Sequence, residues 1–388
     1  MSWQGVYGYD SIALQFARAY ARKRLGGSFL IVAPPNVGKR LFVLTLAKTL
    51  LCRSYADHKR LQTQPMKGLS DELPGAAEQD NQKLLESFHF CGECPSCRQF
   101  HWSFKDGQLI APTHQDFHYI CKPEDKTQIP LELLIGSKDG KTPGLCRQLY
   151  RSAFLAAMKV AVIDDADTLN IEGSNALLKT LEEPPKDTLI FLLGTSAAKQ
   201  LPTIRSRCQI FRFPALEPRD IEAILLAQKI VDNPQTAAEL ARGNATSAVE
   251  ATRALDEDLG KFQKYFLTEL ARANLRAFEL SEKIMEHVDA KGKESVIRRA
   301  RLREVIRIAI EFYRHALANL GEATPRASLY DSYVQALFSS NGELDLEQLA
   351  QCMTRTIDAL DQVDRNINIP VIVESWLYDL RRIDAIHG

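Results

Sequence analysis

The feature that most constrains this fold is a short apolar run that leads through a glycine-containing loop into a helix. Residues 28–32 form the apolar run, residues 33–38 the loop, and residues 39–52 the predicted helix. A short, continuous apolar run is typical of a strand that is buried on both faces. A strand that leads directly into a helix favours a parallel sheet, because parallel neighbours need a crossover connection that is usually helical.

The same alternation continues along the chain. Helices are predicted at about 145–157 and 173–181, and strands at 117–121, 159–163, 188–194 and 209–213. This order predicts an α/β domain whose mostly parallel sheet has helices on both faces. Residues 53–90 interrupt the pattern with Gln, Asp, Glu, Pro and Gly, which indicates a solvated and partly disordered insertion.

The strand signal ends near Glu217, and the remainder of the chain is predicted to be helical. We expect an α/β domain at 1–215, a small helical lid at 216–255 and an all-helical domain at 256–388. No tandem repeat of fixed period is visible. Because apolar positions recur at helical spacing in the last segment, they are interpreted first as the core of a helix bundle.

Composition excludes several classes of protein. Charged residues make up 25% of the 388 residues, and Lys+Arg equals Asp+Glu at 49 each, so global charge does not indicate a strongly basic nucleic-acid binder. The first ten residues lack the pattern of a secretory signal, and no run is long and apolar enough to span a membrane. The eight cysteines are not spaced as a secreted disulfide framework. We therefore expect a cytoplasmic protein.

The loop at 33–40 resembles a phosphate-binding loop in which two elements are missing. Gly38 and Lys39 stand where such a loop needs a glycine and a phosphate-binding lysine. Ala33 replaces the first glycine, and Arg40 stands where a Ser or Thr hydroxyl binds Mg²⁺. Because arginine cannot ligate a cation, these residues predict a degenerate nucleotide site with weak or absent ATP binding.

A second acidic feature follows the apolar strand at 159–163. Asp164 is placed to hold Mg²⁺ in a nucleotide site, and Asp165 stands where a neighbouring acid positions the attacking water. Asp165 is one methylene shorter than the usual Glu, which weakens the case for hydrolysis. Two solvent-facing acids at a strand end are an equally good interpretation of this pair.

Three cysteines at steps of three residues indicate a metal site. Cys91, Cys94 and Cys97 can converge on one tetrahedral zinc ion. In a reducing compartment a disulfide explains this spacing less well. Cys52, at the end of the predicted loop helix, is the leading candidate for the fourth ligand, and His101 and Cys121 are the alternatives.

Taken in order, these motifs resemble the AAA+ clamp-loader subunits of bacterial DNA polymerase III, and most closely the delta-prime type. The resemblance is dense from about residue 5 to 215. Its carriers are the loop APPNVGKR, Leu51-Cys52, the CxxCxxC module, NALLKTLEEPP at 175–185 and Arg205-Ser206-Arg207-Cys208, with Asn366-Ile367-Asn368-Ile369 as a weaker match in the helical tail.

The resemblance implies a fold, partners and site residues. It implies an AAA+ domain, a lid and an oligomerising collar, in a ring that loads the sliding β clamp onto primer–template DNA. The implied partners are motor subunits of the gamma/tau type and a delta subunit. It further implies structural Zn²⁺ on Cys52, Cys91, Cys94 and Cys97, and an arginine finger at Arg207 that acts on a neighbour's ATP. Thr246, where active relatives carry a sensing arginine, agrees with a subunit that does not hydrolyse ATP.

Two other functions remain open at this point. The chain could be an active AAA+ motor ATPase, which would require a Ser or Thr at position 40. It could instead be a zinc-dependent DNA-binding protein that reads DNA with the cysteine module. The second alternative draws on the basic and aromatic residues near the cysteines, namely Arg98, Phe100, His101, Trp102, Phe104 and Lys105.

Overall fold

A computed structural model of the chain describes residues 2–55, 74–105, 108–123, 126, 128–137, 139, 141, 143–242, 247–253, 257–290, 292, 294–320, 330–340, 346–365 and 367–384. The chain divides into two compact units. The first comprises residues 1–228 with 246–248, and the second comprises residues 229–245 with 249–388. No helix in the described part is long and apolar enough to cross a lipid bilayer. The finer division into three domains at 215 and 255 stays a prediction.

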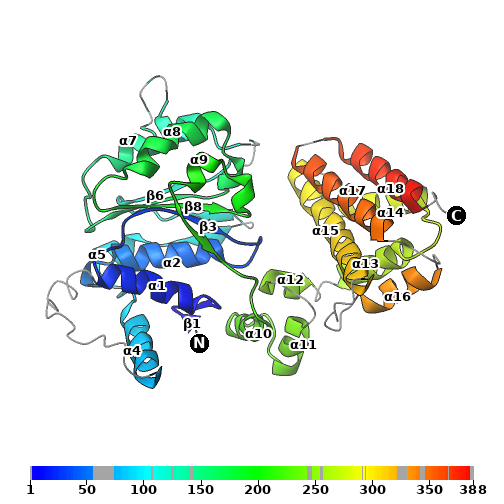
Figure 1. Cartoon of the computed structure of the whole chain (residues 1–388), viewed down its shortest axis with the longest axis horizontal. Coiled ribbons are helices and arrows are strands. Elements are labelled where there is room, and N and C mark those ends of the chain that lie inside the picture. The colour runs from blue at the N-terminus through cyan, green and yellow to red at the C-terminus, as the bar shows by residue number, and fades with distance from the viewer. Residues whose placement is uncertain are drawn as a thin grey trace. The chain divides into compact units, whose positions relative to one another are not determined.

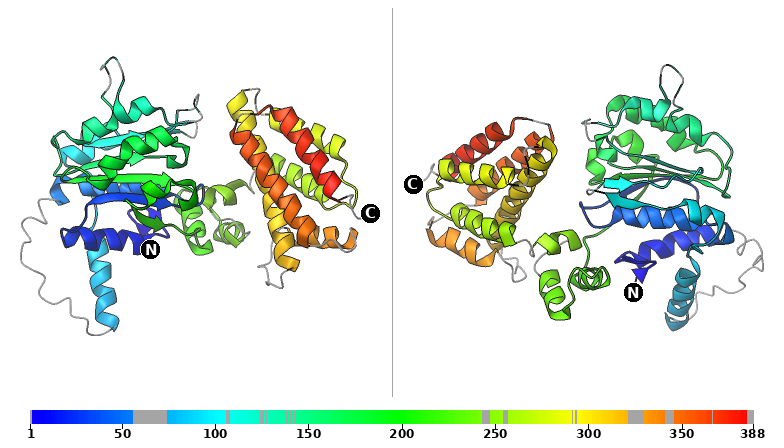
Figure 2. Two further views of the ribbon diagram at one scale, coloured as in Figure 1. Left: turned by 45° about the horizontal axis from the view of Figure 1, so that its top comes forward. Right: turned by 180° about the vertical axis from the view of Figure 1, so that it is seen from behind.

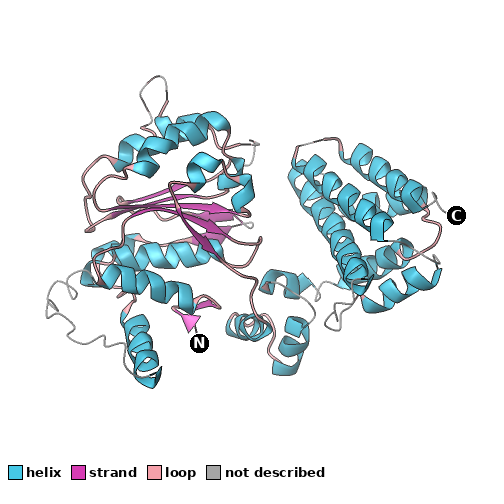
Figure 3. Ribbon diagram, in the orientation of Figure 1, coloured by secondary structure: helices cyan, strands magenta, loops and turns pink. Residues whose placement is uncertain are grey.

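A parallel sheet forms the centre of the first unit (Figures 1 and 3). Its strands run in the order β6-β7-β8-β3-β9, and every neighbouring pair is parallel. The bounds are β3 Gly27–Val32, β6 Phe117–Ile120, β7 Lys159–Ile163, β8 Thr188–Gly194 and β9 Gln209–Arg212. The α/β fold and the parallel sheet predicted from the alternating pattern are therefore confirmed.

Helices cover both faces of this sheet, as the views in Figures 1 and 2 agree. On one face lie α1 (Asp10–Ala21) and α2 (Lys39–Leu51), and on the other lie α7 (Leu145–Leu149), α8 (Ile171–Glu182) and α9 (Pro202–Arg205). Neighbouring side chains of a strand point to opposite faces, so β3 contributes to both layers. Phe29 stacks on Phe191 at 5.2 Å between ring centroids, whereas Leu30 belongs to the apolar cluster on the other face.

One predicted helix is shorter than expected. The sequence predicts a helix at 145–157, but α7 ends at Leu149. The buried carboxylate of Asp116 explains the difference, because it accepts hydrogen bonds from the backbone N–H groups of Phe154, Leu155 and Ala156 at 2.6–2.7 Å. Those N–H groups are thereby satisfied without a helical turn.

The insertion at 53–90 is partly helical. Residues 56–73, which include much of the predicted disordered stretch, lie outside the described residues, but α4 spans Pro74–Ser87. An N-terminal hairpin, β1 (Ser2–Trp3) and β2 (Val6–Tyr7), contacts the chain just after this helix. Trp3 stacks on Phe88, and its Nε1 donates to the Phe88 carbonyl at 2.7 Å. The end of the insertion is therefore part of the packed domain, because its aromatic residue is buried.

Several short elements complete the first unit. They are α5 (Pro95–Gln99), the hairpin β4 (Ser103–Lys105) with β5 (Gln108–Ile110), α6 (Leu131–Ile135) and α10 (Pro218–Ala227). α5 contacts α2, and α6 contacts α7 and α8.

The second unit is helical in all its described elements, as the sequence predicts. It contains α11 (Pro234–Arg242), α12 (Ala248–Arg253), α13 (Glu257–Leu270), α14 (Ala277–Asp289), α15 (Ser295–Leu320), α16 (Asp331–Ser340), α17 (Leu346–Asp364) and α18 (Ile369–Asp384). α15 packs along α17, and α17 along α18. Trp376 is fully buried in this core, and its Nε1 donates to Thr356 Oγ1 at 3.1 Å.

Candidate metal centre and degenerate nucleotide site

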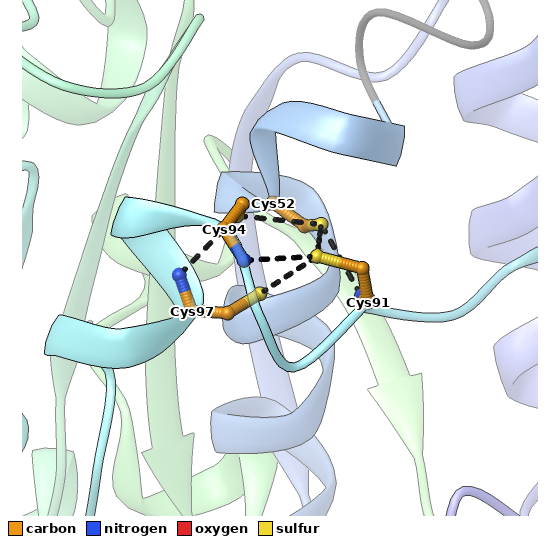
Figure 4. A group of neighbouring side chains, drawn as sticks. All are labelled: Cys52, Cys91, Cys94 and Cys97. Carbon is orange, nitrogen blue, oxygen red and sulfur yellow. Dashed lines mark hydrogen bonds between the residues drawn. The ribbon is translucent and has the colours of Figure 1, made fainter.

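Four cysteine side chains converge at the end of α2 (Figure 4). Cys52 is the C-cap of α2, Cys94 is the N-cap of α5, Cys97 lies within α5, and Cys91 precedes them in the loop after α4. All four Sγ atoms lie within 4.8 Å of one another. The Cys52 sulfur lies 3.6 Å from that of Cys91 and 3.9 Å from that of Cys94, and the Cys91 and Cys97 sulfurs are 4.0 Å apart.

This geometry fits a tetrahedral zinc ion. Four thiolates bonded to zinc at its usual distance lie about 3.8 Å from one another. Backbone N–H groups also point at the sulfurs: Cys91 N lies 3.4 Å from the Cys52 sulfur, Cys94 N 3.3 Å from that of Cys91, and Cys97 N 3.4 Å from that of Cys94. Such donors stabilise the anionic sulfur that zinc requires. A positive φ of 79° at Gly92 lets the loop turn between the first two ligands.

The protein itself favours the thiolate form of Cys52 in this group. Hydrogen bonding with Cys97 is the largest influence on Cys52 and lowers the pKa of its thiol to about 4, against the burial that raises it. Of the three candidates for the fourth ligand, the structure brings only Cys52 to the trio. Cys121 lies instead at the end of β6, where burial and then the nearby Asp164 raise its pKa, and His101 is exposed.

A buried polar relay fixes the position of Cys52. His114 accepts a hydrogen bond at Nδ1 from the Asp116 N–H at 3.1 Å, so its proton lies on Nε2. Nε2 then donates to Ser96 Oγ at 2.8 Å, and Ser96 donates to the Leu51 carbonyl at 2.6 Å. Burial lowers the pKa of His114, which keeps the ring neutral for this role. The relay joins α5 to the end of α2, one residue before Cys52. The sequence pattern alone does not reveal this relay, whose members come together only in the fold.

The phosphate-type loop lies between a strand and a helix, as predicted, but its lysine side chain bonds to the loop's own backbone. It connects β3 to α2, and Gly38 is the N-cap of α2 with a left-handed φ of 91°. Lys39 Nζ donates to the Ala33 carbonyl across the loop at 3.2 Å. Burial lowers the pKa of Lys39, although Asp164 acts in the opposite direction. The loop lysine therefore contacts the loop itself.

Arg40 contacts the acid that would hold Mg²⁺. Asp164 is buried at the end of β7, and its Oδ2 accepts hydrogen bonds from Arg40 Nε and, at 2.6 Å, from the Tyr119 hydroxyl. Its Oδ1 accepts the Asp165 N–H at 2.9 Å. Burial by itself lowers the pKa of Arg40, but the Asp164 carboxylate raises it. Because each carboxylate oxygen has a donor and the charge has a counter-ion, Asp164 is satisfied without a metal.

Two further residues, Asp165 and Tyr119, lie beside Asp164 at this acidic strand end. Asp165 adopts a left-handed φ of 53°, and burial followed by the charge of Asp164 raises the pKa of its carboxyl. The sequence pattern does not point to Tyr119 as a neighbour of Asp164. β6 pairs with β7 so that Tyr119 lies opposite Val162, which brings its side chain beside Asp164. Only the register of the two strands reveals this neighbour.

Arg207 lies at the surface between α9 and β9. Its Nε donates to Glu182 Oε2 at 3.0 Å, and its Nη1 donates to the Thr203 carbonyl at 3.1 Å. The Arg207 side chain is 30% exposed and that of Glu182 is 59% exposed. The structure therefore pairs Arg207 with Glu182, the last residue of α8, and not with the residues of the phosphate-type loop. Gly243 to Thr246, the predicted site of a missing sensor, lie outside the described residues.

The residues near the cysteines that suggested DNA binding differ in their exposure. Phe100 is fully buried and packs on Phe117 at 4.8 Å between centroids. The Lys48 ammonium lies over the Trp102 ring, and Nζ is 5.4 Å from the ring centroid. Of the residues that suggested a DNA-binding module, Arg98, His101 and Phe104 are exposed, and the Lys105 side chain lies outside the described part. Of the three aromatic residues that suggested base stacking, Phe100 is a core residue, Trp102 is half-buried and Phe104 is exposed.

Comparisons with known proteins agree with the sequence motifs. Residues 75–217 match the family described as DNA polymerase III, delta subunit. The chain is 28% identical over 181 residues to the DNA polymerase III subunit delta' of Pseudomonas aeruginosa, a match that covers 47% of this chain and 41% of that protein. It is 30% identical over 186 residues to the delta' subunit of Bacillus subtilis, covering 46% and 51%. A shorter match of 83 residues is 40% identical to the gamma/tau subunit of Mycobacterium tuberculosis, covering 20% and 14%.

The chain thus spans about half, or less, of the length of the curated relatives it matches. Within that span, the matches confirm the resemblance to delta-prime subunits of DNA polymerase III that the motifs indicate.

Proposed function

We propose that the chain is a non-hydrolysing, delta-prime-type subunit of a DNA polymerase III clamp loader. In this role it assembles with gamma/tau-type motor subunits and a delta subunit in the cytoplasm, and the complex loads the sliding β clamp onto primer–template DNA. The family match over residues 75–217 and the two delta' relatives support the family assignment. The observation that carries the non-hydrolysing role is the contact between Arg40 and the buried Asp164.

The chemistry of Mg²⁺ explains why that contact matters. Hydrolysis of a nucleoside triphosphate needs a cation held between phosphate oxygens, a carboxylate and a loop hydroxyl. Here a guanidinium replaces the hydroxyl and takes the carboxylate as its own partner. A metal ion would have to displace this fixed positive charge and would gain no ligand from it. ATP binding by the chain itself is therefore weak or absent.

The four cysteines have a structural role in this proposal. In this role a Zn²⁺ ion is bound by four thiolates, those of Cys52, Cys91, Cys94 and Cys97. The ion would neutralise the thiolate charges and cross-link the segments that carry them, and it would take no part in catalysis. The ion connects the end of the loop helix to a short helix more than forty residues further along the chain. No water-binding position is left when four thiolates coordinate a tetrahedral ion, so this site has no catalytic ligand position.

Arg207 is the residue through which the chain acts on ATP. We assign it as an arginine finger that stabilises the transition state in the nucleotide site of a neighbouring subunit. Its support is its position at the domain surface, its partial exposure and its delocalised charge, which matches the spread negative charge of a transferring phosphoryl group. Arg205 is exposed on the preceding short helix and serves as a matched control.

The test is the ATPase activity of the assembled complex. With Arg207→Ala in this chain, the complex should assemble normally yet lose much of its DNA-stimulated ATPase, since a finger supplied in trans contributes about 10³- to 10⁵-fold at a single site. Arg205→Ala should have a much smaller effect. Lys39→Ala and Arg40→Thr should leave the rate unchanged, because the chain's own loop hydrolyses nothing. A complex that keeps its full rate with Arg207→Ala would refute the finger, and turnover by the isolated chain that Lys39→Ala abolishes would refute the non-hydrolysing role.

A further inference from the structure

The guanidinium of Arg207 is held on one side by its own chain. Nε donates to Glu182 Oε2 at 3.0 Å, and Nη1 donates to the Thr203 carbonyl at 3.1 Å and to Ser206 Oγ at 3.4 Å. Glu182, Ser206 and Arg207 line an open hollow on the surface of the domain. Within the described part of the chain, Nη2 has no acceptor, so its two N–H groups remain free for another molecule.

Glu182 occupies an unfavourable position for a carboxylate. It is the last residue of α8, where the partial negative charge of the helix end repels an acid. Arg207 offsets this repulsion, but an ion pair whose carboxylate is 59% exposed contributes little to overall stability. The value of the contact therefore lies in orientation. A long, flexible arginine that is hydrogen-bonded at Nε and Nη1 has few rotamers left to lose when it meets a phosphate.

We infer that Glu182 is a positioning residue for Arg207, which it holds by Nε so that Nη2 faces the γ-phosphate of ATP on the neighbouring subunit. This inference rests on the proposed function of Arg207. The contact with Glu182 persists when Nη2 donates to the phosphate, because the two bonds use different N–H groups. Glu182 is thus a support that remains engaged during hydrolysis, and it is not a latch that must open first.

The experiment uses the complete clamp-loader complex, reconstituted with the full-length chain carrying Glu182→Ala, Glu182→Gln or the control Glu183→Ala. Steady-state ATPase is measured against MgATP concentration in the presence of primed DNA and clamp, and assembly is checked by co-elution. With Glu182→Ala we expect turnover at the one site that Arg207 serves to fall by about 10- to 100-fold, up to the cost of a displacement of roughly 1 Å in a reacting group. The kcat of the complex then loses most of that site's share, with KM for MgATP little changed. Glu182→Gln retains an acceptor for Nε and should lose less. Glu183→Ala should match the wild type.

A double variant separates positioning from other roles. Glu182→Ala combined with Arg207→Ala should be no slower than Arg207→Ala alone, because the glutamate acts only through the arginine. If Arg207→Ala slows the complex while Glu182→Ala leaves kcat unchanged or raises it, the positioning role is wrong and the finger stands. If the two losses add fully, Glu182 acts independently of Arg207 and the inference is also wrong. If Arg207→Ala has no effect, the proposed finger itself fails.

Discussion

At the scale of single residues, Arg40 determines the character of the nucleotide site. The sequence shows that position 40 lacks a hydroxyl, but it does not show which residue the Arg40 side chain contacts. Its partner Asp164 lies more than a hundred residues further along the chain, and the side chain of Asp164 is 1% exposed whereas that of Arg40 is 34% exposed. The guanidinium therefore has two consequences: it removes a metal ligand, and it neutralises a carboxylate that the fold has buried.

This second consequence predicts a cost for removing the charge. Arg40→Met should lower the free energy of unfolding by about 1–3 kcal/mol, because it leaves a buried carboxylate with hydrogen bonds but no counter-ion, while partial exposure of position 40 lets water compensate in part. Denaturant unfolding of the purified chain measures the change. Arg40→Met combined with Asp164→Asn should recover part of the loss. Equal stability of Arg40→Met and wild type would show that the Arg40–Asp164 ion pair does not stabilise the fold.

At the scale of secondary-structure elements, three ligands of the cysteine module can be predicted from their local spacing, whereas the fourth depends on how two helices pack. Cys91, Cys94 and Cys97 are close in sequence, so their convergence follows from one short loop and α5. Cys52 joins them only because α2 ends beside α5, a contact that the Ser96–His114 relay maintains. The sequence therefore favours Cys52 without excluding Cys121 or His101, and the structure separates the three candidates.

Metal analysis of the purified chain should therefore give about one zinc ion per chain. Cys52→Ser should lose most of the zinc and lower the thermal unfolding midpoint of the first unit, because a structural zinc site contributes directly to folding. Cys121→Ser is the matched control and should keep the zinc. The assignment of the fourth ligand is wrong if Cys52→Ser binds zinc with unchanged affinity while Cys121→Ser does not.

Other elements show the same division between local and tertiary signals. The strands at 159–163 and 188–194 are predictable because each is a short, largely apolar run bounded by polar residues. The end of α7 is not, because it depends on the buried Asp116 carboxylate collecting N–H groups almost forty residues away. The neighbours Tyr119 and Glu182 were also missed, since strand register and helix packing bring them to their partners.

At the scale of the whole molecule, the two compact units have separate cores. The apolar cluster over the sheet face that carries α8 draws its buried residues from 30 to 208, and the cluster of the second unit draws its buried residues from 259 to 380. Each of these two clusters draws its residues from a single unit. In the proposed function, the first unit carries the sites that concern nucleotide and zinc, and residues 257–388 carry assembly with sibling subunits.

Exposed apolar residues on α18 offer a test of that assembly role. Val371 and Tyr378 are seven positions apart, which places them on one face two turns apart, and they are 54% and 63% exposed. Between them, Ile372, Val373, Trp376 and Leu377 are fully buried in the helical core. Substituting the two exposed residues should therefore spare the core, and any loss of assembly would report on contacts with another chain.

The full-length chain with Val371→Glu and Tyr378→Glu should keep its thermal unfolding midpoint but bind the other clamp-loader subunits at least about tenfold more weakly, because a single aromatic hot spot in an interface contributes roughly 2 kcal/mol or more. Association is measured by analytical ultracentrifugation or titration with the motor subunits. Arg381→Glu and Arg382→Glu, near the exposed end of the same helix, form a control for added negative charge. A chain without residues 256–388 is the reference for complete loss of association. If the double glutamate variant and the truncated chain both assemble normally, subunit contacts must lie in the first unit, and the helical tail has another purpose.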